Sequence, residues 1–418
     1  MTASANATRG LFAVVAWRNL WRNPRRTWLT AGGIAFATAL VVFATSIQVG
    51  SYDGMIDTAT RLVSSHIQVQ HPKFHDDPRM RYALPDGIAL AERLANLPGV
   101  AGAAPRAEAF ALLSTEERSF GGLVLGVDPA RDPQVSDLSK ALAQGEYLPG
   151  PDDAFIGAAL ARNLDISLGD ELLVLGTGKE GSVGALALRV GGIFETGHED
   201  TDRSLILVPL TTLQEGFDLG DEVHRILVAA DSIGEIDDVA RSIELTLDEG
   251  YRTLKWNELM PEIEQGIQID WVSGQLMYWL LLILVAFAIV NTFMMTVFER
   301  TREFGMLLAI GMRPASIMGM LQVEAIAMWA IGASIGLAIA LSVIGWLSQT
   351  GIAFGEIAEG MDEISANYFI PERMYPGFSV ESIAMSPAVL GLATLGAAFG
   401  TSLRLRRIRP VDALRTED

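Results

Sequence analysis

Cysteine is absent from this 418-residue chain, and basic residues are scarce beside acidic ones. Without cysteine the chain can form no disulfide, no thiol nucleophile and no cysteine-ligated metal or iron–sulfur centre. The 31 lysines and arginines face 50 aspartates and glutamates, which gives a formal net charge of −19. Because nucleic acids bind to concentrated positive surfaces, this balance argues against a nucleic-acid partner.

Motifs for nucleotide and metal chemistry are missing as well. There is no GxxxxGK[ST] phosphate loop and no HExxH pair, so any ATP that drives this protein must be bound by a separate chain. His66, His71 and His75 lie close together in the sequence, but we interpret them as surface residues. The acidic run from Glu195 to Asp202 around His198 is interpreted as a solvated loop, not as a calcium or acid–base site. We therefore expect no catalytic residue, no metal site and no cofactor in this chain.

Long apolar segments are present instead. Half of the residues are apolar and 19% are charged, which is apolar for a soluble globular protein but too polar for a bundle buried wholly in lipid. A transmembrane helix needs about 20 mostly apolar residues. The qualifying segments are 28–49, 277–297, 316–347 (most apolar from Ala325) and 384–403. A soluble surface helix would show a polar face, whereas Tyr278 to Val290 is apolar at every position. The sequence predicts an α-helical membrane protein with four transmembrane helices.

Basic residues gather on one side of these four segments. Arginines precede the first segment, occupy the loop 298–315 and fill the tail 404–418. The positive-inside rule then places both termini and that loop in the bacterial cytoplasm. Residues 50–276 and 348–383 are expected on the outer side of the cytoplasmic (inner) membrane.

The segment before the first span, within residues 1–27, predicts an amphipathic helix. Trp17 and Trp21 fall on its apolar face, and Arg18 and Arg22 on its polar face. This pattern is typical of a helix that lies on the cytoplasmic leaflet and is anchored there by these four side chains in contact with membrane lipids. A simple basic flank is the alternative interpretation.

Residues 50–276 carry the turn clusters and mixed periodicities of a folded α+β domain. Strand–helix–strand units are predicted near both of its ends, with strands at 65–70 and 100–114 in the first and 223–229 and 251–255 in the second. Two such units in one sheet predict a ferredoxin-like subdomain. The short strands between them predict an inserted β-rich subdomain at about 116–210.

The loop 298–315 contains the sequence FERTREFGMLLAIGMR. It predicts a short helix that begins with charged residues where the chain leaves the membrane and that ends at Gly311. Pro314 then starts the next helix. A partly apolar helix held between two spans could dock into a groove of a soluble partner. An ordinary helical hairpin with charged ends would show the same periodicity.

At this loop the sequence resembles the FtsX-like or MacB-type family of ABC transporter permeases, which includes the LolC/LolE-like permeases of lipoprotein-releasing complexes. The matching string is Glu299-Arg300-x-x-Glu303-x-Gly305-x-Leu307-x-Ala309-Ile310-Gly311, followed by Glu324-Ala325 and a closing Arg409-Pro410-Val411-x-Ala413-Leu414-Arg415. The resemblance implies that Glu299, Arg300, Glu303, Gly305, Leu307 and Gly311 form a coupling helix that contacts the ATPase. Asn291 and Glu324 are then polar residues of helix packing.

The resemblance also implies partners and a function. An ABC ATPase subunit would bind ATP and Mg²⁺, and a second permease copy or paralogue would complete the dimer. The chain itself would be a non-catalytic subunit whose exported MacB-like periplasmic core domain receives force by mechanotransmission and moves or extracts a lipid-linked or hydrophobic substrate such as a lipoprotein. Two alternatives are an FtsX-like regulator of a periplasmic cell-wall hydrolase and a membrane-anchored extracytoplasmic enzyme. The sequence assigns no residue to substrate binding.

Overall fold

The computed structural model describes residues 18, 20–353 and 373–405 and divides the chain into two compact units. The helical unit contains the described residues up to Tyr52, Ile267–Ala353 and those from Arg373 onward, and the α+β domain is Asp53–Gly266. Trp17, most of the predicted N-terminal helix, the acidic part of the loop 348–383 and most of the tail 404–418 lie outside the described residues.

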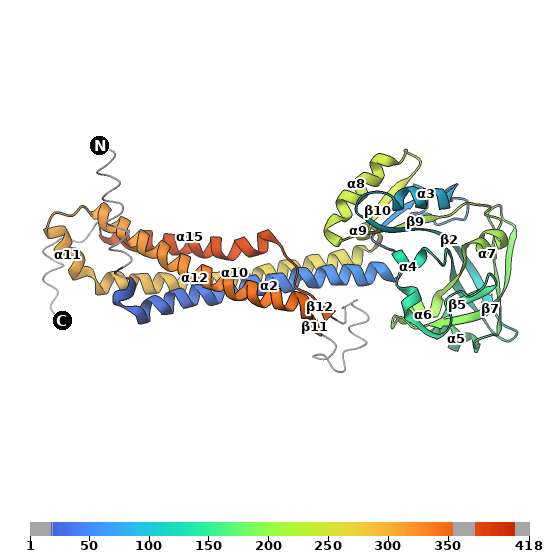
Figure 1. The fold of residues 1–418 in the computed structure, drawn as a ribbon, viewed down its shortest axis with the longest axis horizontal. Helices are drawn as coiled ribbons and strands as arrows, with labels where there is room; N and C mark the ends of the chain where they lie inside the picture. Colours follow the sequence, from blue (N-terminus) through green and yellow to red (C-terminus); the bar gives the residue numbers. More distant parts are fainter. Residues whose placement is uncertain (1–17, 19, 354–372, 406–418) are drawn as a thin grey trace. The chain divides into compact units, whose positions relative to one another are not determined.

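Long apolar helices make up the helical unit (Figure 1). They are α2 (Pro24–Leu62), α10 (Pro261–Glu299), α12 (Pro314–Thr350) and α15 (Val380–Leu405). Within the described residues, four helices are long and apolar enough to cross a membrane, as the sequence predicts. A 39-residue helix such as α2 or α10 is about 58 Å long, whereas a bilayer core is about 30 Å thick. Both helices therefore continue well beyond the apolar segments 28–49 and 277–297.

Two glycines let α12 approach α2 closely. A Cβ on Gly332 would lie 2.6 Å from the Ala31 carbonyl oxygen, and one on Gly336 would lie 2.5 Å from that of Ala35. The two glycines are four residues apart and so share one helix face, the small-xxx-small arrangement that lets transmembrane backbones meet. This contact was not predicted, although the spacing Gly332-x-x-x-Gly336 is visible in the sequence.

A polar ladder joins α2 to α10 within the helical unit. Tyr52 Oη donates to Asp270 Oδ2 at 2.6 Å, and Gln48 Nε2 donates to the same oxygen at 3.2 Å. Tyr278 Oη donates to Gln48 Oε1 at 3.2 Å. Because each polar group here has a partner on the facing helix, the ladder holds the two helices together as a pair.

A single sheet of ten strands organises the α+β domain. The strands are β1 (Ile67–Gln70), β2 (Val100–Ser114), β3 (Ser119–Val127), β4 (Leu142–Gly145), β5 (Asp153–Gly157), β6 (Glu171–Thr177), β7 (Val183–Phe194), β8 (Leu205–Pro209), β9 (Arg225–Ala230) and β10 (Arg252–Lys255). The helices are α3 (Gly87–Ala95), α4 (Asp132–Val135), α5 (Ala158–Leu164), α6 (Glu199–Ser204), α7 (Leu210–Gly216), α8 (Ile236–Thr246) and α9 (Trp256–Leu259), with 3₁₀ turns at Leu138–Ala141 and Ile233–Glu235. A separate two-stranded pair, β11 (Ile352–Ala353) and β12 (Arg373–Met374), belongs to the helical unit.

The first four strands of the sheet path, β10-β1-β9-β2, confirm the ferredoxin-like prediction. All their pairings are antiparallel, and α3 and α8 form the two strand–helix–strand units (Figure 1). In α8 the buried residues are Ile236, Val239, Ala240 and Ile243, which is the spacing of one helix face. That face packs into the core of the domain.

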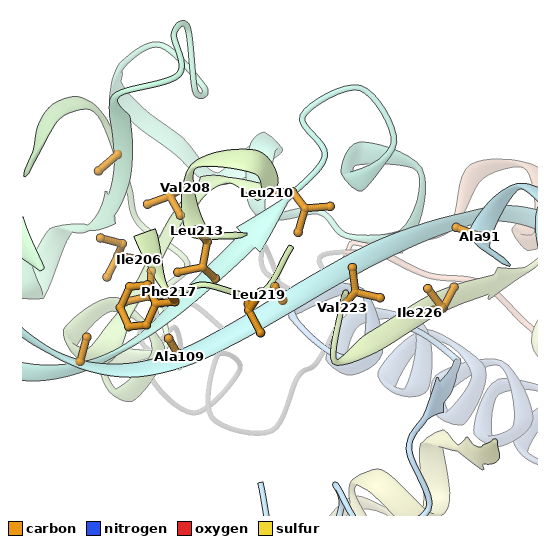
Figure 2. Packing of buried hydrophobic residues seen from close by; sticks show 14 of the residues in the cluster. Ala91, Ala109, Ile206, Val208, Leu210, Leu213, Phe217, Leu219, Val223 and Ile226 are labelled. Carbon is orange, nitrogen blue, oxygen red and sulfur yellow. The ribbon is translucent and has the colours of Figure 1, made fainter. Parts of the chain in front are cut away.

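The β-rich part is an extension of the same sheet. The 15-residue strand β2 pairs with β9 near its start and with β3 and β6 near its end. One buried cluster follows it: Figure 2 shows Ala91, Val223 and Ile226 toward one end of the strand and Ile206, Val208 and Phe217 toward the other. The predicted inserted subdomain therefore shares both sheet and core with the ferredoxin-like part.

Two polar residues interpreted as solvent-facing are buried. His66 is 1% exposed, and its Nδ1 accepts a hydrogen bond from the Ala230 amide at 3.1 Å. Asp202, in the acidic run, is 5% exposed and accepts hydrogen bonds from the Thr196 amide and hydroxyl at 3.0 and 2.7 Å. The surface interpretation of both residues is wrong; the hydrogen bonds from these donors compensate their burial.

Buried His224 makes the stability of the α+β domain depend on pH. Its Nδ1 accepts from the Glu108 amide at 2.9 Å, and its Nε2 donates to the Met80 carbonyl at 3.2 Å. Burial, the largest effect, lowers the pKa of His224 to about 4, and the positive charges of Arg225 and Lys179 act in the same direction. The unfolded chain, whose imidazole keeps a pKa of about 6.5, then binds the proton first.

As pH falls from about 6.5 toward 4, the domain should lose up to ~3 kcal/mol of stability, because protonation destroys the Nδ1 acceptor. Hydrogen exchange of peptides covering β9 and the middle of β2 should accelerate over this range after correction for intrinsic rates. The variant His224→Gln should flatten that dependence, whereas His75→Gln, at an exposed position, should leave it unchanged. An unchanged dependence in His224→Gln would assign the effect to another group.

Candidate functional site: the connection between α10 and α12

A short helix, α11 (Thr301–Ala309), connects α10 to α12 at one end of the helical unit (Figure 1). Phe304 and Gly305 form its buried face. Phe304 is 1% exposed and packs in a cluster with Val297 of α10 and Ile317 and Leu321 of α12. Leu307, Leu308 and Met312 are partly buried against the same cluster. One face of α11 is therefore fixed to both of its neighbours.

Arg300 is the centre of a charged cluster under this helix. Its Nη1 donates to Glu324 Oε2 on α12 at 3.0 Å, and its Nε donates to Glu303 Oε2 at 3.1 Å. The guanidinium also lies 5.2 Å from the centroid of the Phe304 ring, within the range of a cation–π contact. Only 2% of the Glu324 side chain and 10% of the Arg300 side chain are exposed. A buried pair of this kind holds together only while both charges are present.

Arg22, from the helical residues 20–22, completes the cluster by pairing with Glu303. Partial burial favours the neutral form of Glu303, but hydrogen bonds from Arg22 and Arg300 outweigh it, so the pKa of Glu303 is lowered. Nearby, the Thr27 hydroxyl donates to the Leu20 carbonyl at 2.6 Å across the break at Asn23-Pro24. The cluster thus ties the segment before α2 to α11 and α12.

The opposite face of α11 is exposed and carries both apolar and basic side chains. Ile310 is 85% exposed and Met306 48%. Arg302 is exposed one turn before Met306, and Arg313 is exposed just beyond Ile310. Two exposed apolar side chains therefore stand between two exposed arginines on this side of the connection. We call Arg302, Met306, Ile310 and Arg313 the α11 outer face.

Gly311 ends this helix in a conformation that other residues rarely adopt. Its φ is +98°, and the amides of Gly311 and Met312 donate to the carbonyls of Leu308 and Leu307 at 3.1 and 3.0 Å. Such a glycine stops the helix and satisfies its last carbonyls. The predicted stop at Gly311 and restart at Pro314 are both present in the structure.

The remaining predicted residues lie around the start of α2 and the end of α10. Glu299 and Asn291 are exposed and line a hollow of about 750 Å³ with Asn23 and Arg25. Among the described residues, the Asn291 amide meets no hydrogen-bonding partner. Trp21 is 46% exposed, its ring stands edge-on to Trp28 with centroids 6.3 Å apart, and Arg18 is exposed. Asn291 therefore lacks, within the described part of this chain, the partner that a helix-packing role requires.

The charges of the cluster balance one another. Its carboxylates are neutralised by arginines, and within the described ranges no three histidine, aspartate or glutamate side chains gather as a metal site would require. Arg22 was predicted to be a membrane anchor, and Glu303 was predicted to belong to the coupling helix. The structure brings them together across 281 positions of sequence, and no local pattern signals such a pair.

Comparisons with known proteins agree with this two-part architecture. Residues 27–245 match the family model of the MacB-like periplasmic core domain, and residues 276–410 match that of the FtsX-like permease C-terminal region. The first match alone covers more than half of the chain. Together the two regions leave out little besides the two ends and the segment 246–275.

The individual relatives have low sequence identity to this chain, but the matches cover most of it. The lipoprotein-releasing system transmembrane protein LolC of Xylella fastidiosa is 24% identical over 400 residues, which cover 92% of this chain and 92% of LolC. The macrolide export ATP-binding/permease protein MacB of Nitrobacter winogradskyi is 26% identical over 98% of this chain, but the match spans only 60% of MacB. The crystal structure of the periplasmic region of MacB from Actinobacillus actinomycetemcomitans aligns with 49% of this chain and 94% of its own, at 15% identity and a TM-score of 0.37.

Proposed function

This chain belongs to the family of the MacB-like periplasmic core domain and is an inner-membrane ABC transporter permease of the LolC/MacB type, and on that premise we propose that it transmits force from a partner ATPase to its α+β domain. ATP hydrolysis would move α11, and α2 and α10 would carry the movement onward. The observation that carries the proposal is the α11 outer face, which is exposed and partly apolar on a helix whose other face is fixed by the Arg300 cluster. Rigid attachment is what a helix needs if a push on it is to reach its neighbours.

In this proposal the ATPase lies in the cytoplasm and binds ATP and Mg²⁺. The arginine distribution supports that orientation, with both termini and α11 in the cytoplasm. A second permease copy or paralogue would face α2 and α10. Support for this partner comes from Asn291, because an amide in an apolar helix is expected to find a hydrogen bond on a neighbouring helix.

The substrate in this proposal is a lipid-linked molecule, and a lipoprotein is the first candidate. The support is the end-to-end similarity to a protein named for lipoprotein release. Ionisable side chains are scarce within the apolar segments. A polar substrate path through the helices would require such groups, so their scarcity agrees with a substrate that is engaged on the outer side of the membrane.

Purification of the full chain from native membranes in a mild detergent tests the proposal. A P-loop ATPase should co-purify, and the complex should hydrolyse ATP. Consistent isolation of the chain without any ATPase, from membranes in which it is active, would contradict the force-transmission role.

Replacing Gly311 by alanine should uncouple ATP hydrolysis from substrate movement. A Cβ at φ +98° strains the helix end by roughly 1–2 kcal/mol, and this should loosen α11 while the membrane helices still assemble. We expect ATP hydrolysis to continue and the movement of substrate per ATP to fall several-fold. Gly319→Ala is the matched control, because a Cβ there meets nothing within 4 Å and the residue lies within α12. Equal coupling in both variants would show that the helix end does not transmit force.

A further inference from the structure

The α+β domain exposes an apolar strip on one face of its sheet. In β2, Ala109, Ala111 and Leu113 are buried, whereas Phe110 is 69% and Leu112 45% exposed. Side chains alternate between the two faces of a strand, so the last two point away from the core. Leu173 of β6, 41% exposed, lies diagonally from Leu112 on the neighbouring strand. Large apolar side chains gathered on one sheet face mark a binding surface.

One missing side chain opens this strip into a groove. Gly121 of β3 pairs with Leu112 on the exposed face of the sheet, whereas Gly176 of β6 pairs with buried Ala111, and a Cβ there would point into the core toward Phe217. A hollow of about 500 Å³ lies over these positions, with Phe110, Leu123 and Leu175 among its walls. A Cβ on Gly121 would meet nothing within 4 Å. The groove can therefore be filled from Gly121 without disturbing the core.

A second hollow of about 440 Å³ adjoins the groove and shares Phe110 and Thr177 with it. Arg79, Arg81 and Lys179 line it. Arg79 pairs with Asp77 at 2.8 Å and Lys179 with Glu222 at 2.6 Å. The Arg81 guanidinium lies 4.9 Å from the centroid of the Tyr82 ring, and no carboxylate pairs with it among the described residues.

The one carboxyl in this second hollow does not cancel the Arg81 charge. Glu108 is 8% exposed, and its Oε1 lies 2.7 Å from Arg225 Nε. Burial raises the pKa of Glu108. The hollow therefore keeps one uncompensated guanidinium in a chain whose net charge is −19. A guanidinium is well suited to recognise a phosphate, because its N–H groups match two of the phosphate oxygens.

From this juxtaposition we propose that the α+β domain binds an anionic phospholipid-type amphiphile, with its acyl chain in the groove over Gly121 and Gly176 and its phosphate at Arg81. Charge complementarity selects this occupant over a neutral lipid. The site's place in transport rests on the proposed function, in which the molecule being moved is lipid-linked; a phosphate at Arg81 would make that molecule a phospholipid-type amphiphile and not a lipoprotein. Binding itself requires no ATP and can be measured separately.

The test uses the full chain in nanodiscs with lysophosphatidylglycerol that carries a photoreactive acyl chain. After illumination we expect adducts on peptides containing Phe110, Leu112 and Leu175. Gly121→Leu should reduce them roughly tenfold, since its side chain occupies the space of the acyl chain. Gly234→Leu is the matched control, because a Cβ there also meets open space.

The head group is tested with Arg81→Glu and a lysophosphatidylcholine probe that has the same chain. The substitution should reduce labelling by the anionic probe several-fold and leave labelling by the zwitterionic probe nearly unchanged. Equal labelling of wild type and Gly121→Leu would overturn the groove assignment, and an equal effect of Arg81→Glu on both probes would overturn the phosphate assignment. If an ATPase co-purifies while labelling at the groove is absent, the lipid site fails and the proposed function stands. If labelling at the groove is present and no ATPase co-purifies, the lipid site stands without a transport role.

Discussion

Replacing Arg300 by methionine should destabilise the helical unit by about 3–5 kcal/mol, the largest effect we expect from any single substitution at the α10–α12 connection. Glu324 would be left 98% buried in an apolar helix without its guanidinium partner. Glu303 would lose one of its two arginines at the same time. Thermal unfolding of the purified protein in detergent, followed by the fluorescence of its tryptophans, measures the loss.

The control for Arg300→Met is Arg302→Met, which removes the same charge from an exposed position two residues away and should cost less than about 1 kcal/mol. The double variant Arg300→Met with Glu324→Met should recover most of the stability, because both charges of the buried pair are then removed. A fully stable Arg300→Met single variant would show that the cluster does not hold α11 in place.

Replacing Ile310 by aspartate should weaken ATPase docking strongly while the permease remains folded. Ile310 is 85% exposed, so a charge there costs the folded chain almost nothing. At the centre of an interface, however, the aspartate carboxylate would lose its hydration without gaining a partner. A residue at the centre of an interface contributes about 2 kcal/mol or more to the free energy of binding. We expect the affinity for the ATPase to fall roughly thirtyfold or more, as measured by co-purification at graded ATPase concentrations.

Leu245→Asp is the matched control for Ile310→Asp, because Leu245 is an equally exposed leucine, at 83%, in the α+β domain. It should leave both folding and ATPase binding unchanged. If Ile310→Asp retained the ATPase at wild-type affinity, the α11 outer face would not be the docking surface. If both variants lost the ATPase equally, the effect would be attributable to added negative charge alone.

Local patterns in the sequence predict much of this fold. The predicted strand 100–114 matches β2 residue for residue, because the turn at 115–118 ends it. Gly311 and Pro314 mark the end of one helix and the start of the next for reasons of backbone geometry alone. Elements whose boundaries are set by such residues can be predicted without tertiary information.

Contacts between distant segments were not predictable in the same way. The pairing of Arg22 with Glu303 depends on how the segment before α2 meets α11, and an arginine beside tryptophans equally suits a membrane surface. His66 looked like a surface residue because its burial depends on the pairing of β1 with β9. The continuity of sheet and core through β2 was missed because a strand's partners at its two ends leave no mark on its own sequence.

A photocrosslinking amino acid placed at position 310 tests the central claim most directly. Because Ile310 stands on the α11 outer face, illumination of native membranes should join the permease to a P-loop ATPase, identified by mass spectrometry. The same amino acid at position 245 should give no such adduct. Adducts of position 310 with lipid alone, from membranes in which the transporter is active, would contradict the account, because α11 would then lie against the bilayer and could not receive force from an ATPase.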